Sequence, residues 1–581
     1  MPAAQAPATT PLESSQHRSS PSGSATPLAG TNGLIARPSS DAAALSSGWW
    51  SDAVIYQIYP RSFSDSNGDG IGDLAGMIDR LPYLSGLGVD AIWLSPFYPS
   101  AGADAGYDVS DPRAIDPVFG TLSDFDELVH QAHATGIRVI VDIVPNHTSS
   151  EHRWFTEALL STPGSAARER YIFRPGCGDG PPNDWESVFG GPAWTRVEGE
   201  DQWYLHLYDS RQPDLNWRNP EVRDEYEDVL RFWLDRGVDG FRIDVAHGLI
   251  KAEGLPDLGG RRTNAVEAGG DVGPMWDQDE VHDIYRSWRQ LLEEYGDDRI
   301  LVAEAWTTPD RLSRYIRPDE MHQAFNFAYL SAGWDAKKVS AIIESSLATT
   351  AEVGATTTWV LSNHDVVRVA SRLGQADPNH WSAGIGAADP QPDLELGRRR
   401  AAAYALLTLA LPGGVYIYQG EELGLPDHTE LDNSRRQDPS YRRTAGAVIG
   451  RDGCRVPMPW ITEAPGHGFG ADPWLPQPDT FRHLAADNQV DDPSSFLNLY
   501  TTALRIRRDL TLGKTPITSI SESEQVLHVV KDTFAVLINF STVPASLDIP
   551  SEGTILLASA PDAYSRGILQ GDSAVWIQLS S

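Results

Sequence analysis

Asp244, Glu304 and Asp365 each stand at the end of a short run of residues that favour β-strands. A carboxyl group beside apolar strands is costly unless it has a task, so its recurrence at three strand ends indicates a shared polar site. Two carboxyls that flank one bond are what glycoside hydrolysis needs, one as the nucleophile and one as the acid and base. Each of the three taken alone could be a solvated loop residue.

From Trp49 onward, short β-rich runs alternate with stretches of helical periodicity. Such alternation favours a parallel sheet, and eight rounds of it favour a closed (β/α)8 (TIM) barrel, so the fold class is α/β. The C-terminal ends of the strands of a barrel open on one face, where the three acids would meet. The eight candidate strands are Val54–Tyr59, Asp90–Leu94, Arg138–Val144, Gly240–Val245, Ile300–Ala303, Gln323–Phe327, Thr357–Ser362 and Gly414–Tyr418.

Two regions depart from the alternation. Residues 148–215 are rich in Gly, Pro and Trp and too long for an ordinary barrel loop, so we expect a small inserted domain over the active face. An amphipathic helix around Phe496–Leu510 is followed by runs that predict a small β domain, at Val526–Val530, Phe534–Ile538 and Val575–Leu579. The predicted domains are a disordered tail in 1–46, a catalytic barrel in 47–147 and 216–512, the insertion in 148–215 and the C-terminal domain in 513–581.

The composition narrows the class of partner. A net charge of −34 argues against nucleic acid and anionic membranes, since both attract Lys and Arg. The N-terminal residues lack the apolar region of a signal peptide, and no segment is expected to span a membrane. Two cysteines, Cys177 and Cys454, cannot form a disulfide framework, so we expect a cytoplasmic protein, as a monomer or homodimer.

Several sequence blocks carry a family resemblance. The chain from about Trp49 to Ser581 resembles the α-amylase superfamily of glycoside hydrolases, family 13, and within it the α-glucosidase and oligo-1,6-glucosidase group. Four signature blocks occur in the expected order, and a fifth is similar to the form seen in the oligo-1,6-glucosidase group. The blocks are Asp142–His147, Gly240–Asp244, Glu304–Trp306 and Ser362–Asp365, and the fifth is Gln212–Trp217.

This resemblance implies a TIM barrel with a B domain inserted after strand 3 and a C-terminal antiparallel β-sandwich. It implies a retaining, exo-acting α-glucosidase that hydrolyses terminal non-reducing α-linked glucose of short α-glucosides, with some transglucosylation. Asp244 would be the nucleophile that forms a β-glucosyl ester, Glu304 the acid and base, and Asp365 the stabiliser of the transition state.

Further residues are assigned on the same resemblance. His147 and His364 resemble the histidines that bind glucose hydroxyls. Asp108 looks like the residue that holds the terminal glucose, with Tyr107 as a stacking platform, and Arg455 resembles the arginine that closes the pocket against Asp108. Arg242 is also assigned by strand geometry. It lies two residues before Asp244 on a strand, so it points to the same face and can hold that carboxylate ionised.

The run Asp65–Asp73 carries a second chemical signal. Its oxygen-bearing residues are spaced as at the start of an EF-hand loop, although Gly76 stands where the bidentate Glu would be. It resembles the calcium or magnesium loop after the first barrel strand in this group of enzymes. The implied ligands of this structural cation are Asp65, Asn67, Asp69, Asp73 and the carbonyl of Ile71, and an acidic turn without metal is the alternative.

Two questions stay open at this level. A transglycosylase or isomerase of the trehalose synthase or sucrose isomerase type would use the same three acids, although Ser362 resembles the hydrolases. Val245 directly after the nucleophile favours α-1,6 bonds in this group, whereas Ala303–Trp306 is similar to enzymes that prefer maltose-type bonds. A non-catalytic transporter subunit of this fold would need a membrane helix.

Overall fold

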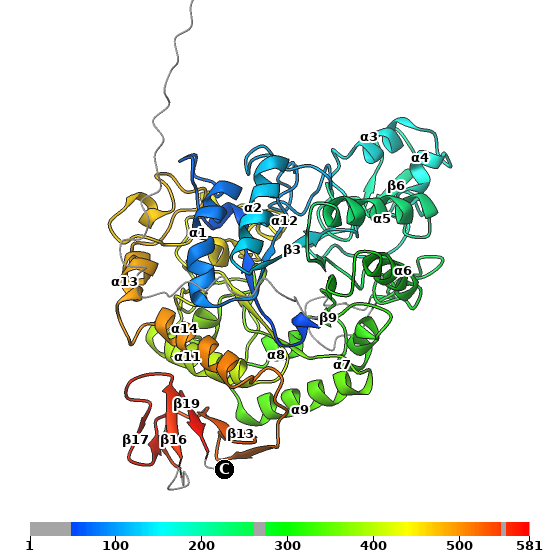
Figure 1. Cartoon of the computed structure of the whole chain (residues 1–581). Helices are drawn as coiled ribbons and strands as arrows, with labels where there is room; N and C mark the ends of the chain where they lie inside the picture. Colours follow the sequence, from blue (N-terminus) through cyan, green and yellow to red (C-terminus); the bar gives the residue numbers. More distant parts are fainter. Residues whose placement is uncertain (1–47, 261–272, 548–552, 580–581) are drawn as a thin grey trace, which may run out of the picture.

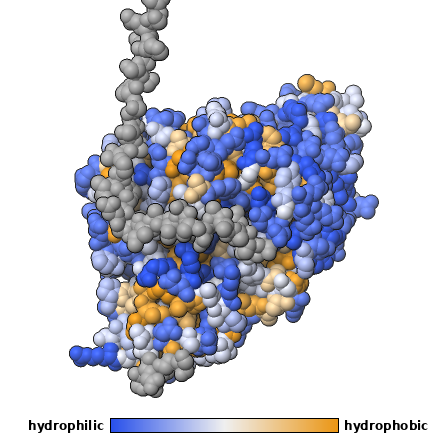
Figure 2. Space-filling view, viewed as in Figure 1, coloured by the Kyte–Doolittle hydropathy of each residue, from blue (hydrophilic) through white to orange (hydrophobic). Residues whose placement is uncertain are grey.

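The structure, a computed structural model, describes residues 48–260, 273–547 and 553–579. The predicted N-terminal tail, 1–46, lies outside the described residues. In the described ranges, no helix has both the length and the apolar character that crossing a membrane requires. Hydrophilic residues dominate the face of the molecule shown in Figure 2, with smaller hydrophobic areas between them.

Eight parallel strands form a nearly closed barrel, which confirms the predicted fold class. The hydroxyl of Thr358 on the first strand in the sheet order donates to the carbonyl of Ala324 on the last, and so bridges the open seam. In the order of their pairing the strands are β10 (Thr358–Val360), β11 (Gly414–Tyr418), β1 (Val54–Ile58), β2 (Ala91–Leu94), β3 (Arg138–Ile143), β7 (Gly240–Ile243), β8 (Ile300–Ala303) and β9 (Gln323–Ala324).

Helices connect the strands, and their ends follow from the sequence. The first, α1 (Leu74–Leu87), is capped by the Asp73 carboxylate and ends at Gly88, whose φ of 97° suits glycine. The other long helices are α2 (Leu122–Ala134), α5 (Pro220–Leu234), α6 (Val281–Glu293), α9 (Ala336–Glu352), α11 (Leu394–Ala410) and α14 (Phe496–Asp509). Shorter ones are α3 (Arg153–Leu160), α4 (Ala166–Glu169), α7 (Pro309–Leu312), α8 (Phe327–Leu330), α10 (Val369–Leu373), α12 (Pro439–Arg443) and α13 (Ala486–Val490).

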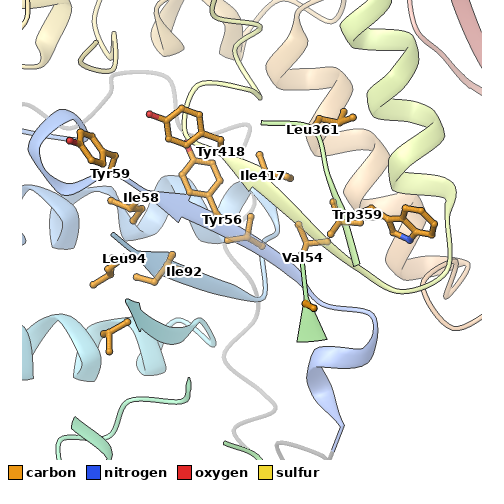
Figure 3. Packing of buried hydrophobic residues seen from close by; sticks show 14 of the residues in the cluster. Val54, Tyr56, Ile58, Tyr59, Ile92, Leu94, Trp359, Leu361, Ile417 and Tyr418 are labelled. Carbon is orange, nitrogen blue, oxygen red and sulfur yellow. The ribbon is translucent and has the colours of Figure 1, made fainter. Parts of the chain in front are cut away.

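Side-chain alternation along the strands decides which residues reach the site. Val54, Tyr56 and Ile58 of β1 belong to the large core cluster that the strands form with the surrounding helices (Figure 3). Ile55, of opposite parity, belongs to a second cluster of residues from facing strands, together with Ile140. Successive side chains point to opposite faces of a strand. Residues an even number of positions after a member of this second cluster therefore also point into the barrel, and those at the strand ends reach its opening.

The inserted domain is small. Its three-stranded antiparallel sheet consists of β4 (Phe173–Pro175), β6 (Gln202–Leu205) and β5 (Trp194–Arg196), and lies within the predicted insertion (Figure 1). Lys251, which follows β7, joins the insertion to the barrel through Asp214 at 2.7 Å and Asn146 at 2.8 Å. This buried cation fixes the insertion over the C-terminal ends of the strands.

The C-terminal residues form two antiparallel sheets around one apolar cluster, as the resemblance implied. Figure 1 shows them (red) beside α11, whose Leu406 carbonyl accepts the indole N–H of Trp576 at 2.9 Å. The larger sheet contains β12 (Ser519–Ser523), β13 (Val526–Lys531), β14 (Phe534–Asn539), β19 (Ser573–Gln578) and β16 (Thr554–Ala558). The smaller contains β15 (Ala545–Ser546), β18 (Ile568–Leu569) and β17 (Tyr564–Ser565).

Candidate active site

A cavity of about 1000 Å³ opens where the barrel strands end. Its wall combines acidic residues from the strand ends with aromatic and aliphatic residues from the insertion and the long loops, a composition that suits a small polar ligand with apolar faces. The wall includes Asp104, Tyr107, His147, Tyr208, Asp244, Val245, His247, Trp276, Glu304, Trp306, Asp365 and Arg451.

Arg242 holds the carboxylates together. One guanidinium nitrogen, Nη1, donates to Asp244 Oδ1 at 2.6 Å and to Asp142 Oδ1 at 2.8 Å, and Nη2 lies 2.9 Å from Glu304 Oε2. All four side chains point to the same face of the sheet. Arg242 pairs directly with Asp142 and with Val302, and Asp244 and Glu304 follow two residues after Arg242 and Val302. The structure therefore brings the predicted nucleophile and acid/base to one cation.

The cluster carries more negative charge than its arginine neutralises. Burial raises the pKa of Asp244, and the carboxylates of Glu304 and Asp142 add to this rise while Arg242 opposes it. Burial likewise raises the pKa of Asp142 to about 7, against the effect of Arg242. Burial among these groups therefore favours the protonated forms of Asp244 and Asp142, against the effect of Arg242.

The residue after Asp244 is strained. Val245 has a φ of 47°, in the left-handed region that β-branched residues rarely adopt. Its N–H donates to Glu304 Oε2 at 2.9 Å, and the next N–H, of Ala246, donates to the Glu304 carbonyl at 2.8 Å. These bonds hold the strained turn in place, so the position of Glu304 is tied to the backbone that carries Asp244.

Asp365 has a separate set of partners. Arg451 Nη1 and Arg455 Nη2 both lie 2.9 Å from its Oδ1, and His364 Nε2 lies 3.2 Å from its Oδ2. Burial alone would raise the pKa of Asp365, but the contact with His364 and the positive charges of Arg451 and Arg455 outweigh burial and keep this pKa below its ordinary value. Asp365 is therefore ionised at neutral pH, which suits a group that binds hydroxyls and stabilises positive charge.

The predicted contact between Arg455 and Asp108 is wrong. Asp108 is fully buried and accepts hydrogen bonds from Ser100 Oγ at 2.6 Å and from the backbone N–H of Asp104 at 3.1 Å. The ion pair that the structure shows is between Arg451 and Asp104, with Arg451 Nη2 donating to Asp104 Oδ1 at 2.6 Å. Both of these residues line the cavity. Asp108 thus supports the backbone of Asp104.

The predicted histidines, His147 and His364, both contact the predicted aromatic residue, Tyr107. Tyr107 lines the cavity, donates to Asp142 Oδ2 at 3.0 Å and stacks on His364 with ring centroids 5.1 Å apart. His364 is fully buried behind Tyr107. His147 lines the cavity, and burial lowers its pKa to about 4, so it is neutral. Their contacts with glucose hydroxyls stay a prediction.

The predicted metal loop stands apart from the cavity. Asp65 Oδ1 accepts from the N–H groups of Asn67 and Gly68, and Asp69 Oδ1 accepts from the N–H of Ile71 at 2.9 Å. Asp73 caps α1. Within residues 48–260, 273–547 and 553–579, no group of three or more His, Cys, Asp and Glu side chains is arranged to hold a metal ion. The cation therefore stays a prediction.

Sequence reasoning missed Asp104 and Arg451, although each lies four residues before a residue that was named. Asp104 precedes the Gly106-Tyr107-Asp108 motif, and Arg451 is the first arginine of the Gly450–Arg455 block. Two acids in one loop and two arginines in one block were the available signal. Only the loop conformation decides which member of each pair reaches the cavity.

Comparison with known proteins agrees with the site. The model of the alpha-amylase catalytic domain family matches residues 57–513. A probable alpha-glucosidase of Rhizobium meliloti is 39% identical over 484 residues, which cover 79% of this chain and 82% of the relative. An oligo-1,6-glucosidase of Parageobacillus thermoglucosidasius is 36% identical over 79% of this chain and 84% of the relative.

Solved structures give the same result. The alpha-glucosyl transfer enzyme XgtA aligns with a TM-score of 0.80 at 36% identity, covering 91% of this chain and 99% of that one. The trehalulose synthase MutB from Pseudomonas mesoacidophila aligns with a TM-score of 0.81 at 29% identity, covering 92% and 100%. The chain belongs to the α-amylase family of glycoside hydrolases, in its α-glucosidase and oligo-1,6-glucosidase group.

The pairing of Arg451 with Asp104 can be tested by mutation. Replacing Asp104 with Asn removes the negative charge that faces Arg451 in the cavity. We expect kcat/KM on an α-glucoside to fall by about 100-fold, because the Arg451 guanidinium loses this ionic partner. The matched variant Asp108→Asn should lose less activity and more thermal stability, because Asp108 is buried behind the wall. Initial rates and melting curves of both variants measure this, and an activity loss confined to Asp108→Asn would restore the first assignment.

Proposed function

We propose that this enzyme is a retaining, exo-acting α-glucosidase that releases terminal α-linked glucose from short α-glucosides. The observation that carries the proposal is the pair Asp244 and Glu304 held by Arg242 at one cavity. Two carboxyls on one small cation lie close together, as double displacement through a glycosyl ester requires. Relatives named alpha-glucosidase and oligo-1,6-glucosidase support the substrate class.

The chemistry follows from the partners of each group. Asp244 attacks the anomeric carbon while Glu304 gives its proton to the leaving oxygen, so that a glucosyl ester forms and the C–O bond to the leaving group breaks. Glu304, now ionised, takes a proton from a water molecule. The water oxygen attacks the anomeric carbon, so that the bond to Asp244 breaks and glucose is released. Arg242 keeps Asp244 oriented, and the low pKa of Asp365 leaves an anion beside the positive charge that develops on the sugar.

The closed end of the cavity supports exo action. Arg451 contacts both Asp104 and Asp365, so the arginine occupies the space beside the group that stabilises the glucose. A chain extended beyond its terminal glucose would displace this ion pair. We therefore expect short substrates to react and internal bonds of long polymers to resist.

A transglycosylase or isomerase is the second candidate. It would use the same three acids and differ in how long the cavity excludes water from the ester. A trehalulose synthase and an alpha-glucosyl transfer enzyme among the solved neighbours favour this candidate. Some transglucosylation accompanies hydrolysis in the proposed function.

One experiment tests the function and its linkage preference. Initial rates on maltose, isomaltose, sucrose, trehalose and starch should show free glucose from the first two and little reaction of starch, with α-glucose as the first anomer in proton NMR. Val245 beside Glu304 favours isomaltose, while the sequence around the acid/base favours maltose. Conversion of sucrose or maltose into an isomer without release of glucose would establish the second candidate instead.

Replacing Glu304 with Gln separates proton transfer from binding. The amide keeps the shape but cannot give a proton, so rates on maltose or isomaltose should fall by about 10² to 10⁴, whereas formation of the ester from 4-nitrophenyl α-glucoside should fall far less. Hydrolysis of the ester lacks its base and slows. Mass spectrometry should therefore detect one glucosyl unit on the peptide that contains Asp244.

The control for this measurement is Asp244→Asn. It should abolish both the reaction and the adduct for every leaving group, because no nucleophile remains. Wild-type rates of the Glu304→Gln variant on the disaccharides would require another carboxylate as the acid/base.

We also propose that the loop Asp65–Asp73 binds a calcium or magnesium ion. Carboxylate, amide and carbonyl oxygens of Asp65, Asn67, Asp69, Asp73 and Ile71 are the donors that these cations prefer. The loop contacts the long segment before α14, since Trp474 donates its backbone N–H to the Gly70 carbonyl at 2.9 Å. A cation would thus stabilise the packing of that segment.

Chelation should lower the melting temperature by a few degrees and leave the initial rate at room temperature nearly unchanged, because bound ligand stabilises the folded state by mass action and the loop lies outside the cavity. Calorimetry with and without chelator measures the shift, and Asp69→Asn should show a smaller one. An identical melting curve, with no calcium or magnesium by elemental analysis, would leave an acidic turn.

A cytoplasmic location is a further proposal. Cys177, which is exposed, and Cys454, which is buried, are both free thiols, as is usual in reducing compartments. A monomer or a homodimer remains the prediction for the assembly.

A further inference from the structure

His247 is a buried imidazole in the cavity wall that the mechanism above does not use. It lies three residues after Asp244, lines the same cavity as Glu304, and is 2% exposed. One face of its ring stacks on Trp276, with centroids 4.9 Å apart and an interplanar angle of 26°. Aromatic packing on one face and a cavity beside it leave the ring edge as the part that can meet a ligand.

The backbone fixes the place of this ring. The N–H of Gly248 donates to the Val245 carbonyl at 2.8 Å, and the N–H of Asp277 donates to the His247 carbonyl at 2.6 Å. A Cβ at position 248 would lie 2.6 Å from a methyl of Val245 and 2.9 Å from the Trp276 ring. The glycine therefore allows the tight turn that holds His247 between Val245 and Trp276.

At least one of the two ring nitrogens lacks a partner in the described part of the chain. Among the described residues, neither nitrogen makes a well-formed hydrogen bond. The Glu304 carbonyl faces one ring nitrogen and favours the charged form of the ring, so the other nitrogen is the one left for a ligand. Buried polar atoms are normally paired, and an unpaired one in a cavity wall indicates a ligand contact.

The chemical state of the ring defines what it can bind. Burial lowers the pKa of His247 to about 4, although Glu304 and Asp277 act in the opposite direction, so the imidazole is neutral. A neutral imidazole has one donor and one acceptor nitrogen, and a sugar hydroxyl can pair with either. Because the ring is uncharged, it does not add a second cation beside Glu304 that would favour the ionised form of this carboxyl.

We propose that His247 hydrogen-bonds a hydroxyl of the leaving-group sugar, or of the acceptor sugar in transglucosylation. Glu304 gives its proton to the leaving oxygen, so groups beside Glu304 face the departing sugar, whereas Asp104 and Arg451 stand beside Asp365 at the closed end. His247 is thus a specificity-determining residue for leaving groups that carry hydroxyls. This inference rests on the proposed function.

The test compares leaving groups in the variant His247→Phe, which keeps a ring on Trp276 and removes both nitrogens. Maltose and isomaltose have hydroxyls in the leaving group, phenyl α-glucoside has none but needs the Glu304 proton, and 4-nitrophenyl α-glucoside has none and needs it least. We expect kcat/KM on the disaccharides to fall about tenfold more than on either aryl glucoside, through KM. His247→Gln should restore part of the difference.

Other outcomes contradict the inference in distinct ways. Equal losses on all four substrates would make His247 structural, and a loss on phenyl but not on 4-nitrophenyl α-glucoside would mean that it acts through Glu304. No loss on any substrate would leave a water molecule as its partner. A wild-type enzyme inactive on all four would overturn the proposed function itself.

His322→Phe is the matched control. His322 is also buried, but its Nδ1 accepts the N–H of Leu301 at 3.1 Å near the start of β8, away from the strand ends that form the cavity. This variant should lower the melting temperature without changing the ratio of disaccharide to aryl-glucoside rates. A changed ratio in this control would show that the ratio reports stability, and would remove the support for His247.

Discussion

The ionic contacts of Arg242 are the constraint on which the site depends. Its guanidinium joins carboxylates that end three neighbouring strands, Asp142, Asp244 and Glu304, and it is 2% exposed. Removing one buried partner from such a cluster leaves an uncompensated charge, which is strongly destabilising. The barrel must therefore bring β3, β7 and β8 into one register before any catalytic geometry exists, and this register is set by their backbone pairing.

The second half of the site depends on loops. Arg451 reaches Asp365 from the loop that follows β11, and Asp104 reaches Arg451 from the loop that follows β2. These residues are far apart in sequence and meet only because both strand ends open on the same face. The division has a chemical consequence, since burial beside other carboxyls raises the pKa of Asp244, whereas the two arginines that face Asp365 keep its pKa below the ordinary value.

The inserted domain adds the wall that the barrel lacks. Tyr208 and Phe189 come from the insertion, and they line the cavity opposite the strand ends. Buried Lys251 ties Asp214 of the insertion to Asn146 beside His147. Movement of the insertion would therefore disturb His147 in the cavity wall, so this junction links the shape of the cavity to the packing of the two domains.

The sequence by itself determined the barrel strands, the three acids and the face of the strand on which Arg242 lies, because hydrophobic periodicity and strand alternation are local properties. It missed β12, whose residues are largely exposed and mostly polar, and β16, whose apolar residues are half-buried or exposed and do not alternate with polar ones. It named Asp108 and Arg455 where the cavity uses Asp104 and Arg451. Each choice lay between like residues four positions apart, and it is decided by loop conformation, with Gly106 at a φ of 112° and a short 3-10 helix at Asp452–Arg455. Only the tertiary structure fixes such loops, because their backbone is held by contacts with distant strands.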